Sequence, residues 1–196
     1  MATTHYLIGR VTVGSGGASS ITFSNIPSTY TDLVLKCSSR STVSSTNDDL
    51  LISYNSNTSS YSWRLIQGTG QGSGSSYNGT DRRYTTINGN TTTSNVFTNF
   101  EVYIPNYAGS SYKSASIDTV DENNATATYN ELVASLWSNT SAITSIAFTL
   151  TSGNFAQYTT ASLYGVSATG DGTKVPYASG GDIIATDGTY CCLLYT

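Results

Sequence analysis

Apolar and polar residues alternate along most of this chain with a period of two, which is typical of half-buried β-strands. Segments such as Leu33-Val34-Leu35 and Val102-Tyr103-Ile104 carry the β-branched and aromatic side chains that fit a pleated sheet surface. No segment shows convincing helical periodicity. The alternation predicts strands near residues 4–13, 19–24, 32–38, 49–54, 61–67, 83–88, 95–104, 112–120, 126–136, 142–151 and 160–167.

Many short strands at this spacing predict an all-β fold, either an antiparallel sandwich or a barrel. We expect a β-sandwich with the jelly roll as first choice of topology, since strand order cannot be read from the sequence. Two breaks in the alternation, residues 39–48 and the glycine- and serine-rich residues 67–82, are predicted to be long loops. Long loops in compact domains are often functional, although solvent-facing decoration is an equally good interpretation.

The composition changes after Val166, where glycines replace the alternation. We therefore predict a sandwich domain over residues 1–167 and a linker with a C-terminal arm or hairpin over residues 168–196. The Asp187-Gly188 pair is a hairpin-turn signal within this arm. Because an isolated hairpin is only marginally stable, we expect the arm to pack on a neighbouring subunit during assembly. The apolar arm residues available for that contact are Ile183, Ile184, Tyr190, Leu193, Leu194 and Tyr195.

The composition implies a surface with little charge. Charged residues make up 10% of the chain and the net charge is −4, while a hydrophobic content of 38% argues against disorder. Eight Lys plus Arg against twelve Asp plus Glu do not favour the basic patch that a nucleic-acid partner needs. No signal peptide or membrane-spanning stretch is evident, so we expect synthesis in a cytoplasm and no membrane partner. Three cysteines, Cys37, Cys191 and Cys192, form no disulfide or metal pattern.

Few residues could carry catalysis. His5 is the only histidine, and the chain has no Gly-x-Ser-x-Gly nucleophile motif. Asp118, Asp121 and Glu122 cluster near a strand end, where paired carboxylates could hydrolyse a glycan or, with the neighbouring asparagines at 123–124, offer oxygen ligands to calcium. Turn-forming surface residues are the preferred interpretation. We therefore predict a non-enzymatic protein with no catalytic residue, no cofactor and no metal ligand.

Aromatic residues are better candidates for binding. Exposed Tyr and Trp rings can stack on sugar rings while neighbouring Asn, Asp and Arg side chains bond the hydroxyls. The residues predicted to lie in or beside loops, and therefore to bind carbohydrate, are Trp63, Tyr77, Tyr84, Tyr107 and Tyr112. Trp63 follows Tyr61 by two residues, which places both on one face of a strand. The alternative is that Trp63 and Trp137 are core residues, because aromatic side chains dominate core burial.

Several blocks of the chain carry a resemblance to a known family. They read ITFSNIPSTYTDLVL at 21–35, NFEVYIPNY at 99–107, LWSNTSAITSI at 136–146, SGNFAQY at 152–158 and LYGV at 163–166. These blocks are spread along residues 5–166, outside the two predicted loops. They resemble a family of small virion structural proteins, decoration-like or fibre-like, of tailed phages and especially cyanophages. The segment at 180–190 resembles the start of a glycine-rich module of phage fibre-like proteins.

The resemblance implies a non-enzymatic structural protein on the surface of a bacteriophage particle, released by lysis of the host. Such a capsid decoration protein or short fibre would act by self-association, with a trimer expected, and by docking to other virion proteins. The alternative is a tail fibre or receptor-binding module that recognises host surface carbohydrate. A third hypothesis, a glycan-degrading depolymerase, is the least favoured.

Overall fold

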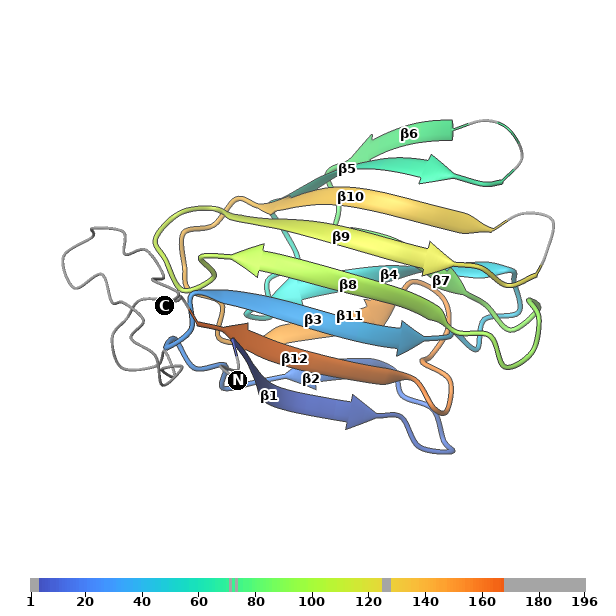
Figure 1. The fold of residues 1–196 in the computed structure, drawn as a ribbon, viewed down its shortest axis with the longest axis horizontal. Helices are drawn as coiled ribbons and strands as arrows, with labels where there is room; N and C mark the ends of the chain where they lie inside the picture. Colours follow the sequence, from blue (N-terminus) through green and yellow to red (C-terminus); the bar gives the residue numbers. More distant parts are fainter. Residues whose placement is uncertain (1–3, 71, 73, 125–127, 168–196) are drawn as a thin grey trace, which may run out of the picture.

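The protein folds as a two-layered β-sandwich in which every strand pairing is antiparallel, as the computed structural model of residues 4–70, 72, 74–124 and 128–167 shows (Figure 1). The larger sheet holds eight strands in the spatial order β1 (His5–Thr12), β12 (Thr160–Val166), β3 (Asp32–Ser39), β8 (Thr98–Pro105), β9 (Lys113–Asp121), β10 (Tyr129–Trp137), β5 (Tyr61–Gly68) and β6 (Gly74–Gly79). The smaller sheet holds four, in the order β2 (Ser20–Phe23), β11 (Ile146–Leu150), β4 (Asn47–Tyr54) and β7 (Arg83–Asn88).

The predicted antiparallel sandwich is therefore confirmed, whereas the jelly-roll topology is not. A jelly roll distributes eight strands over two sheets. Here the sheets contain eight and four strands, so the larger one extends well past the smaller. The predicted domain boundary after residue 167 stays a prediction. The predicted arm, with Ile183, Ile184, Tyr190, Leu193, Leu194 and Tyr195, lies outside the described residues.

Each of the eleven predicted strands overlaps a strand of the structure, but the prediction of one uninterrupted loop over residues 67–82 was wrong. Residues Gly74–Gly79 form β6, which pairs with β5 along its whole length. Tyr77 is the one aromatic residue in this strand, and glycines and serines supply most of the rest. The side chains of β6 carry too little apolar surface to produce a visible alternation in the sequence. Backbone pairing with β5 places this strand in the sheet.

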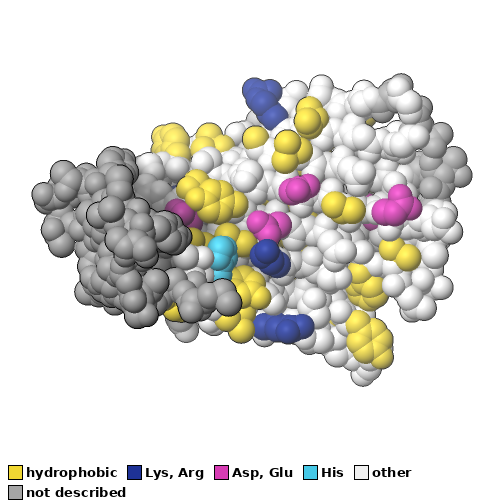
Figure 2. Space-filling view, viewed as in Figure 1, with side chains coloured by type: hydrophobic (Ala, Val, Ile, Leu, Met, Phe, Trp, Pro, Cys, Tyr) yellow, Lys and Arg dark blue, Asp and Glu magenta, His cyan; other side chains and the backbone are white. Residues whose placement is uncertain are grey.

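The core lies between the two sheets, where alternate residues of the strands point inward. In β9 the burial alternates without interruption from Lys113 to Asp121. An aromatic cluster fills one region of this core: Trp137 stacks on Tyr61 with ring centroids 6.2 Å apart and lies 5.5 Å from Tyr54. The outer face of the larger sheet, seen in Figure 2, shows charged side chains scattered sparsely among uncharged ones.

The predicted loop at residues 39–48 is confirmed in its middle, but its ends are not solvent-facing decoration. Ser39, Arg40, Ser41 and Asp48 are all buried. The Ser41 hydroxyl donates to the Asp48 carboxylate over 2.7 Å, which closes the loop on itself. The Arg40 guanidinium donates to four backbone carbonyls of the segment at 90–96 that follows β7. This connection is therefore an ordered part of the sandwich end.

Candidate functional site

Three of the five predicted carbohydrate-binding residues do not form a common site. Tyr84 is fully buried, and its hydroxyl is hydrogen-bonded to that of Tyr54 in the core. Tyr107 is also fully buried, and its hydroxyl donates to the carbonyl of Pro27. A ring enclosed by protein cannot stack on a sugar, so the assignment of Tyr84 and Tyr107 to binding was wrong. Tyr112 is 58% exposed but lies outside the cleft that the other two residues share.

Trp63 and Tyr77 do meet, in a cleft of about 380 Å³ on the inner side of the β5–β6 pair. Trp63 lies opposite Gly79 in the β5–β6 register and Tyr77 lies opposite Leu65, so both side chains belong to the same face of the sheet. Tyr77 is 54% exposed. The other lining residues are mostly polar: Asn47, Asp49, Leu65, Gln67, Asn78, Arg83, Thr86 and Tyr129. We refer to this hollow as the Trp63–Tyr77 cleft.

The cleft exists because the two sheets differ in width. The edge strand β7 of the smaller sheet packs against β9 and β10 of the larger one. The larger sheet continues past β7 through β5 to β6, the strands drawn at the top of Figure 1. Inward-pointing residues of β6 therefore have no opposing sheet, and Tyr77 stays exposed on the face where other strands are buried. The volume lies in the range of small-molecule binding pockets.

Trp63 forms a fixed wall of this cleft. Its indole Nε1–H donates to Asp81 over 2.7 Å, and the Arg83 guanidinium carbon lies 5.2 Å from the ring centroid. The ring also lies close to Gly79, where an added Cβ would come within 2.6 Å of Trp63 Cζ2. Because these contacts cover much of the indole, Trp63 is half-buried and packs against the core. The alternative prediction that Trp63 is a core residue is therefore correct in part. The exposed ring of Tyr77 is the one available for stacking.

Arg83 joins the cleft to a buried polar network. Its Nε donates to Asp49 over 2.9 Å and its Nη2 donates to Glu131 over 3.0 Å. Glu131 is fully buried and also accepts hydrogen bonds from Thr85 and Thr86. Burial opposes the charge of Arg83, but the two carboxylates outweigh it and raise the pKa of Arg83. Sequence reasoning missed Arg83, Asp49 and Glu131, although charged residues within strands of so uncharged a chain were a usable signal.

The acidic cluster predicted from the sequence is divided by the strand. Asp118 points to the outer face of β9, whereas Asp121 is buried on the inner face. Glu122 is exposed and accepts a hydrogen bond from the backbone N–H of Asn124. Among the described residues, no group of three His, Cys, Asp or Glu side chains converges as a metal site. The three carboxylates therefore do not face one common opening.

The acidity of Asp121 is strongly altered by its surroundings. Burial raises its pKa to about 6, with help from Glu131 and Glu122, while the Thr98 hydroxyl and Arg40 act in the opposite direction. Since the pKa in the folded state exceeds the unfolded value, protonation of Asp121 stabilises the fold. This contribution is complete below the unfolded pKa of about 4 and is lost as the pH rises through about 6.

We expect Asp121→Asn to stabilise the protein at neutral pH, because the amide cannot carry the buried charge. The gain should be on the order of 1–3 kcal/mol at pH 7 and should vanish near pH 4. Urea unfolding of both proteins at about pH 4 and about pH 7 measures it. If Asp121→Asn and the parent protein were equally stable at both pH values, the Asp121 carboxylate would not be destabilised in the folded protein.

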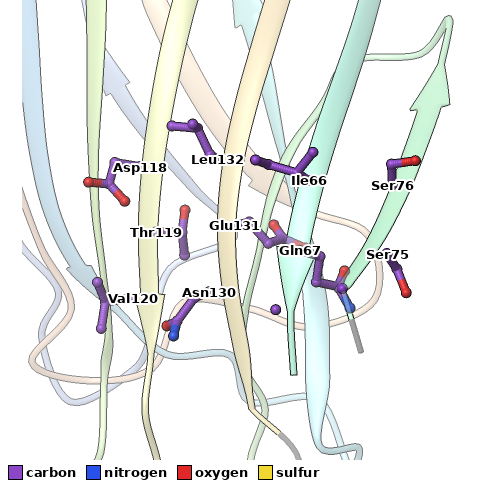
Figure 3. A pocket seen from close by; sticks show the side chains of 12 residues that line it. Ile66, Gln67, Ser75, Ser76, Asp118, Thr119, Val120, Asn130, Glu131 and Leu132 are labelled. Carbon is purple, nitrogen blue, oxygen red and sulfur yellow. The ribbon is translucent and has the colours of Figure 1, made fainter. Parts of the chain in front are cut away.

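A second candidate surface lies on the outer face of the larger sheet (Figure 3). Ile66, Leu132 and Val120 are 60%, 53% and 51% exposed. Ile66 and Leu132 are register partners across β5 and β10, and Val120 follows Asp118, the partner of Leu132 on β9, by two residues. A groove of about 580 Å³ runs over these residues. We call this surface the outer apolar patch.

Comparisons with protein-family models, with curated proteins and with solved structures found no match to this chain. Within the described part of the chain, no helix has the length and apolar character needed to cross a membrane. The two candidate surfaces must therefore be interpreted from their own chemistry.

Proposed function

We propose that this chain is a non-enzymatic structural protein on the surface of a tailed-phage particle, acting by self-association and by docking to other virion proteins. The observation that carries this proposal is the outer apolar patch. Ile66, Val120 and Leu132 each expose more than half of their surface on one face. Contiguous exposed apolar side chains on a polar face mark association surfaces. The resemblance of the sequence blocks to virion proteins is the reason for placing this association on a phage particle.

The proposal assigns no catalytic residue. His5 is exposed at the start of β1, where it contacts the Thr4 hydroxyl and the edge of the Tyr164 ring. Glu131 is fully buried and held by Arg83 and two threonines. Binding is thus the activity that these side chains support.

Self-association through the patch is tested by Leu132→Lys. The new ammonium would lie opposite Asp118, which the fold can accommodate, but an interface would have to bury it. We expect association weakened about tenfold or more, measured as a shift toward monomer in light scattering. Ser114→Lys, an exposed position on the same face of β9, is the matched control and should leave association unchanged. A wild-type protein that is monomeric at all concentrations would contradict the proposal.

The Trp63–Tyr77 cleft favours a second function, recognition of host surface carbohydrate. It combines an exposed tyrosine ring with the amides of Asn47 and Gln67 and the carboxylate of Asp49. A few polar groups converging beside apolar walls are typical of small-molecule sites. The two functions are compatible, because the cleft and the outer apolar patch lie on opposite faces of β5.

Recognition of carbohydrate predicts a specific loss on Tyr77→Ala. Removing the exposed ring should reduce binding to host polysaccharide about tenfold, as expected for an exposed aromatic anchor in a binding site. Tyr112→Ala is the matched control, since Tyr112 is equally exposed, at 58%, but lies outside the cleft. Binding that both variants retain, or both lose, would contradict a site at Tyr77.

A further inference from the structure

The charges around the Trp63–Tyr77 cleft are unequal. Its lining includes one carboxylate that is partly exposed, Asp49, and one guanidinium, Arg83. Directly behind the guanidinium lies the buried carboxylate of Glu131, and Asp81 holds the indole of Trp63. Three acids therefore surround Arg83, and they outnumber the bases of this region even when the neighbouring Arg82 is counted. An anion entering the cleft would meet a net negative field.

Two of the three guanidinium nitrogens of Arg83 are already engaged. Arg83 Nε is bound to Asp49, and Nη2 is shared between Thr86 and Glu131. The remaining nitrogen, Nη1, has no hydrogen-bond partner among the described residues, but it is buried and a ligand in the cleft does not reach it in this conformation. The Arg83 side chain as a whole is 14% exposed, and its guanidinium lies over the Trp63 ring. A carboxylate or sulfate on a ligand could displace Asp49 only by leaving that acid unpaired beside it.

The polar groups that remain available to a ligand are one oxygen of the Asp49 carboxylate and neutral side-chain amides. Asp49 uses Oδ1 for Arg83, and no described residue donates to its Oδ2. Asn47 and Gln67 supply amides, which both donate and accept. Vicinal hydroxyls of a sugar can donate to a carboxylate oxygen and exchange hydrogen bonds with amides. The Tyr77 ring offers an apolar platform for the other side of the sugar.

We propose that the Trp63–Tyr77 cleft selects uncharged sugar units and rejects uronic, sialic and sulfated ones. This inference rests on the carbohydrate-recognition function proposed above. Tyr77 is the stacking platform, Asp49 accepts from sugar hydroxyls, and the amides of Asn47 and Gln67 complete the hydrogen bonding. Arg83 positions Asp49 and supports Trp63 and does not itself contact the ligand.

The test is calorimetric titration of the full chain with neutral hexose oligosaccharides and with oligouronates and sulfated oligosaccharides of matched length. Binding is expected for neutral ligands alone. The affinity should change less than about twofold between about 50 and about 500 mM NaCl, because no ligand charge is screened. Tyr77→Ala should weaken binding about tenfold, and Tyr112→Ala should leave it unchanged.

The outcomes separate this inference from the function on which it rests. Binding of acidic glycans that weakens steeply with salt would overturn the charge selection and leave carbohydrate recognition standing. Binding of neutral glycans that Tyr77→Ala does not alter would move the site elsewhere and overturn the inference. No binding of either class would overturn carbohydrate recognition itself, without bearing on self-association through the outer apolar patch.

Discussion

Arg83→Met should destabilise the protein by about 3–5 kcal/mol, because it leaves the buried Glu131 carboxylate without its cation. Threonine hydroxyls and one backbone N–H would still donate to Glu131. These neutral donors cannot replace a full charge in a buried site. Urea unfolding measures the loss. Adding Glu131→Gln should recover part of it, since the double variant no longer buries an unpaired charge.

Lys36→Met provides the comparison. Lys36 and Glu101 form an ion pair of similar length, 2.9 Å, but both side chains are about half exposed. A solvent-exposed pair contributes about 0–1 kcal/mol, so this variant should be close to the parent in stability. If Arg83→Met costs no more than Lys36→Met, the Arg83–Glu131 pair is not the buried anchor that its geometry indicates.

Arg40→Ala should cost about 3 kcal/mol or more, because the guanidinium serves four backbone carbonyls at once. The distances are 2.7 Å to Val96, 2.8 Å to Thr93, 3.1 Å to Thr92 and 3.3 Å to Asn90. Arg40→Lys should also destabilise, since an ammonium on a thinner side chain cannot reach the same set. Urea unfolding gives the stability, and hydrogen exchange over residues 89–97 should accelerate in both variants.

Arg10→Ala is the control for this clamp, since Arg10 is an exposed residue of β1. Its removal should change the stability by less than about 0.5 kcal/mol. Unchanged exchange over residues 89–97 in Arg40→Ala would contradict the assignment of Arg40 as the residue that orders this segment.

The strands of this fold could be predicted because alternation reports which face of a sheet is buried. The alternation is clearest in β8 and β9, where every second residue is buried. It fails in β7, where the five residues from Tyr84 to Asn88 are all buried. Tyr84, near the start of this strand and beside a predicted loop, was therefore predicted to be an exposed carbohydrate-binding residue, although it lies in the core. Burial on both faces depends on distant segments that the local pattern does not describe.

The candidate site could be predicted only in part for the same reason. Trp63 and Tyr77 were identified by residue type, but their meeting depends on β6, which has almost no apolar pattern. Asp49 and Arg83 come from adjacent strands of the other sheet and lie 34 positions apart in the sequence. The cleft arises from the unequal widths of the two sheets, and a sequence without visible strand order cannot reveal that difference.

The central claim is the proposed location of this protein on the surface of a tailed-phage particle, and a cryo-electron-microscopy reconstruction of purified particles tests it most directly. The account predicts density for the sandwich on the particle surface, with the outer apolar patch of Ile66, Val120 and Leu132 against a neighbouring subunit. It also predicts that the Trp63–Tyr77 cleft faces the solvent. Absence of the chain from purified particles, or its presence with the patch exposed and the cleft covered, would contradict the account.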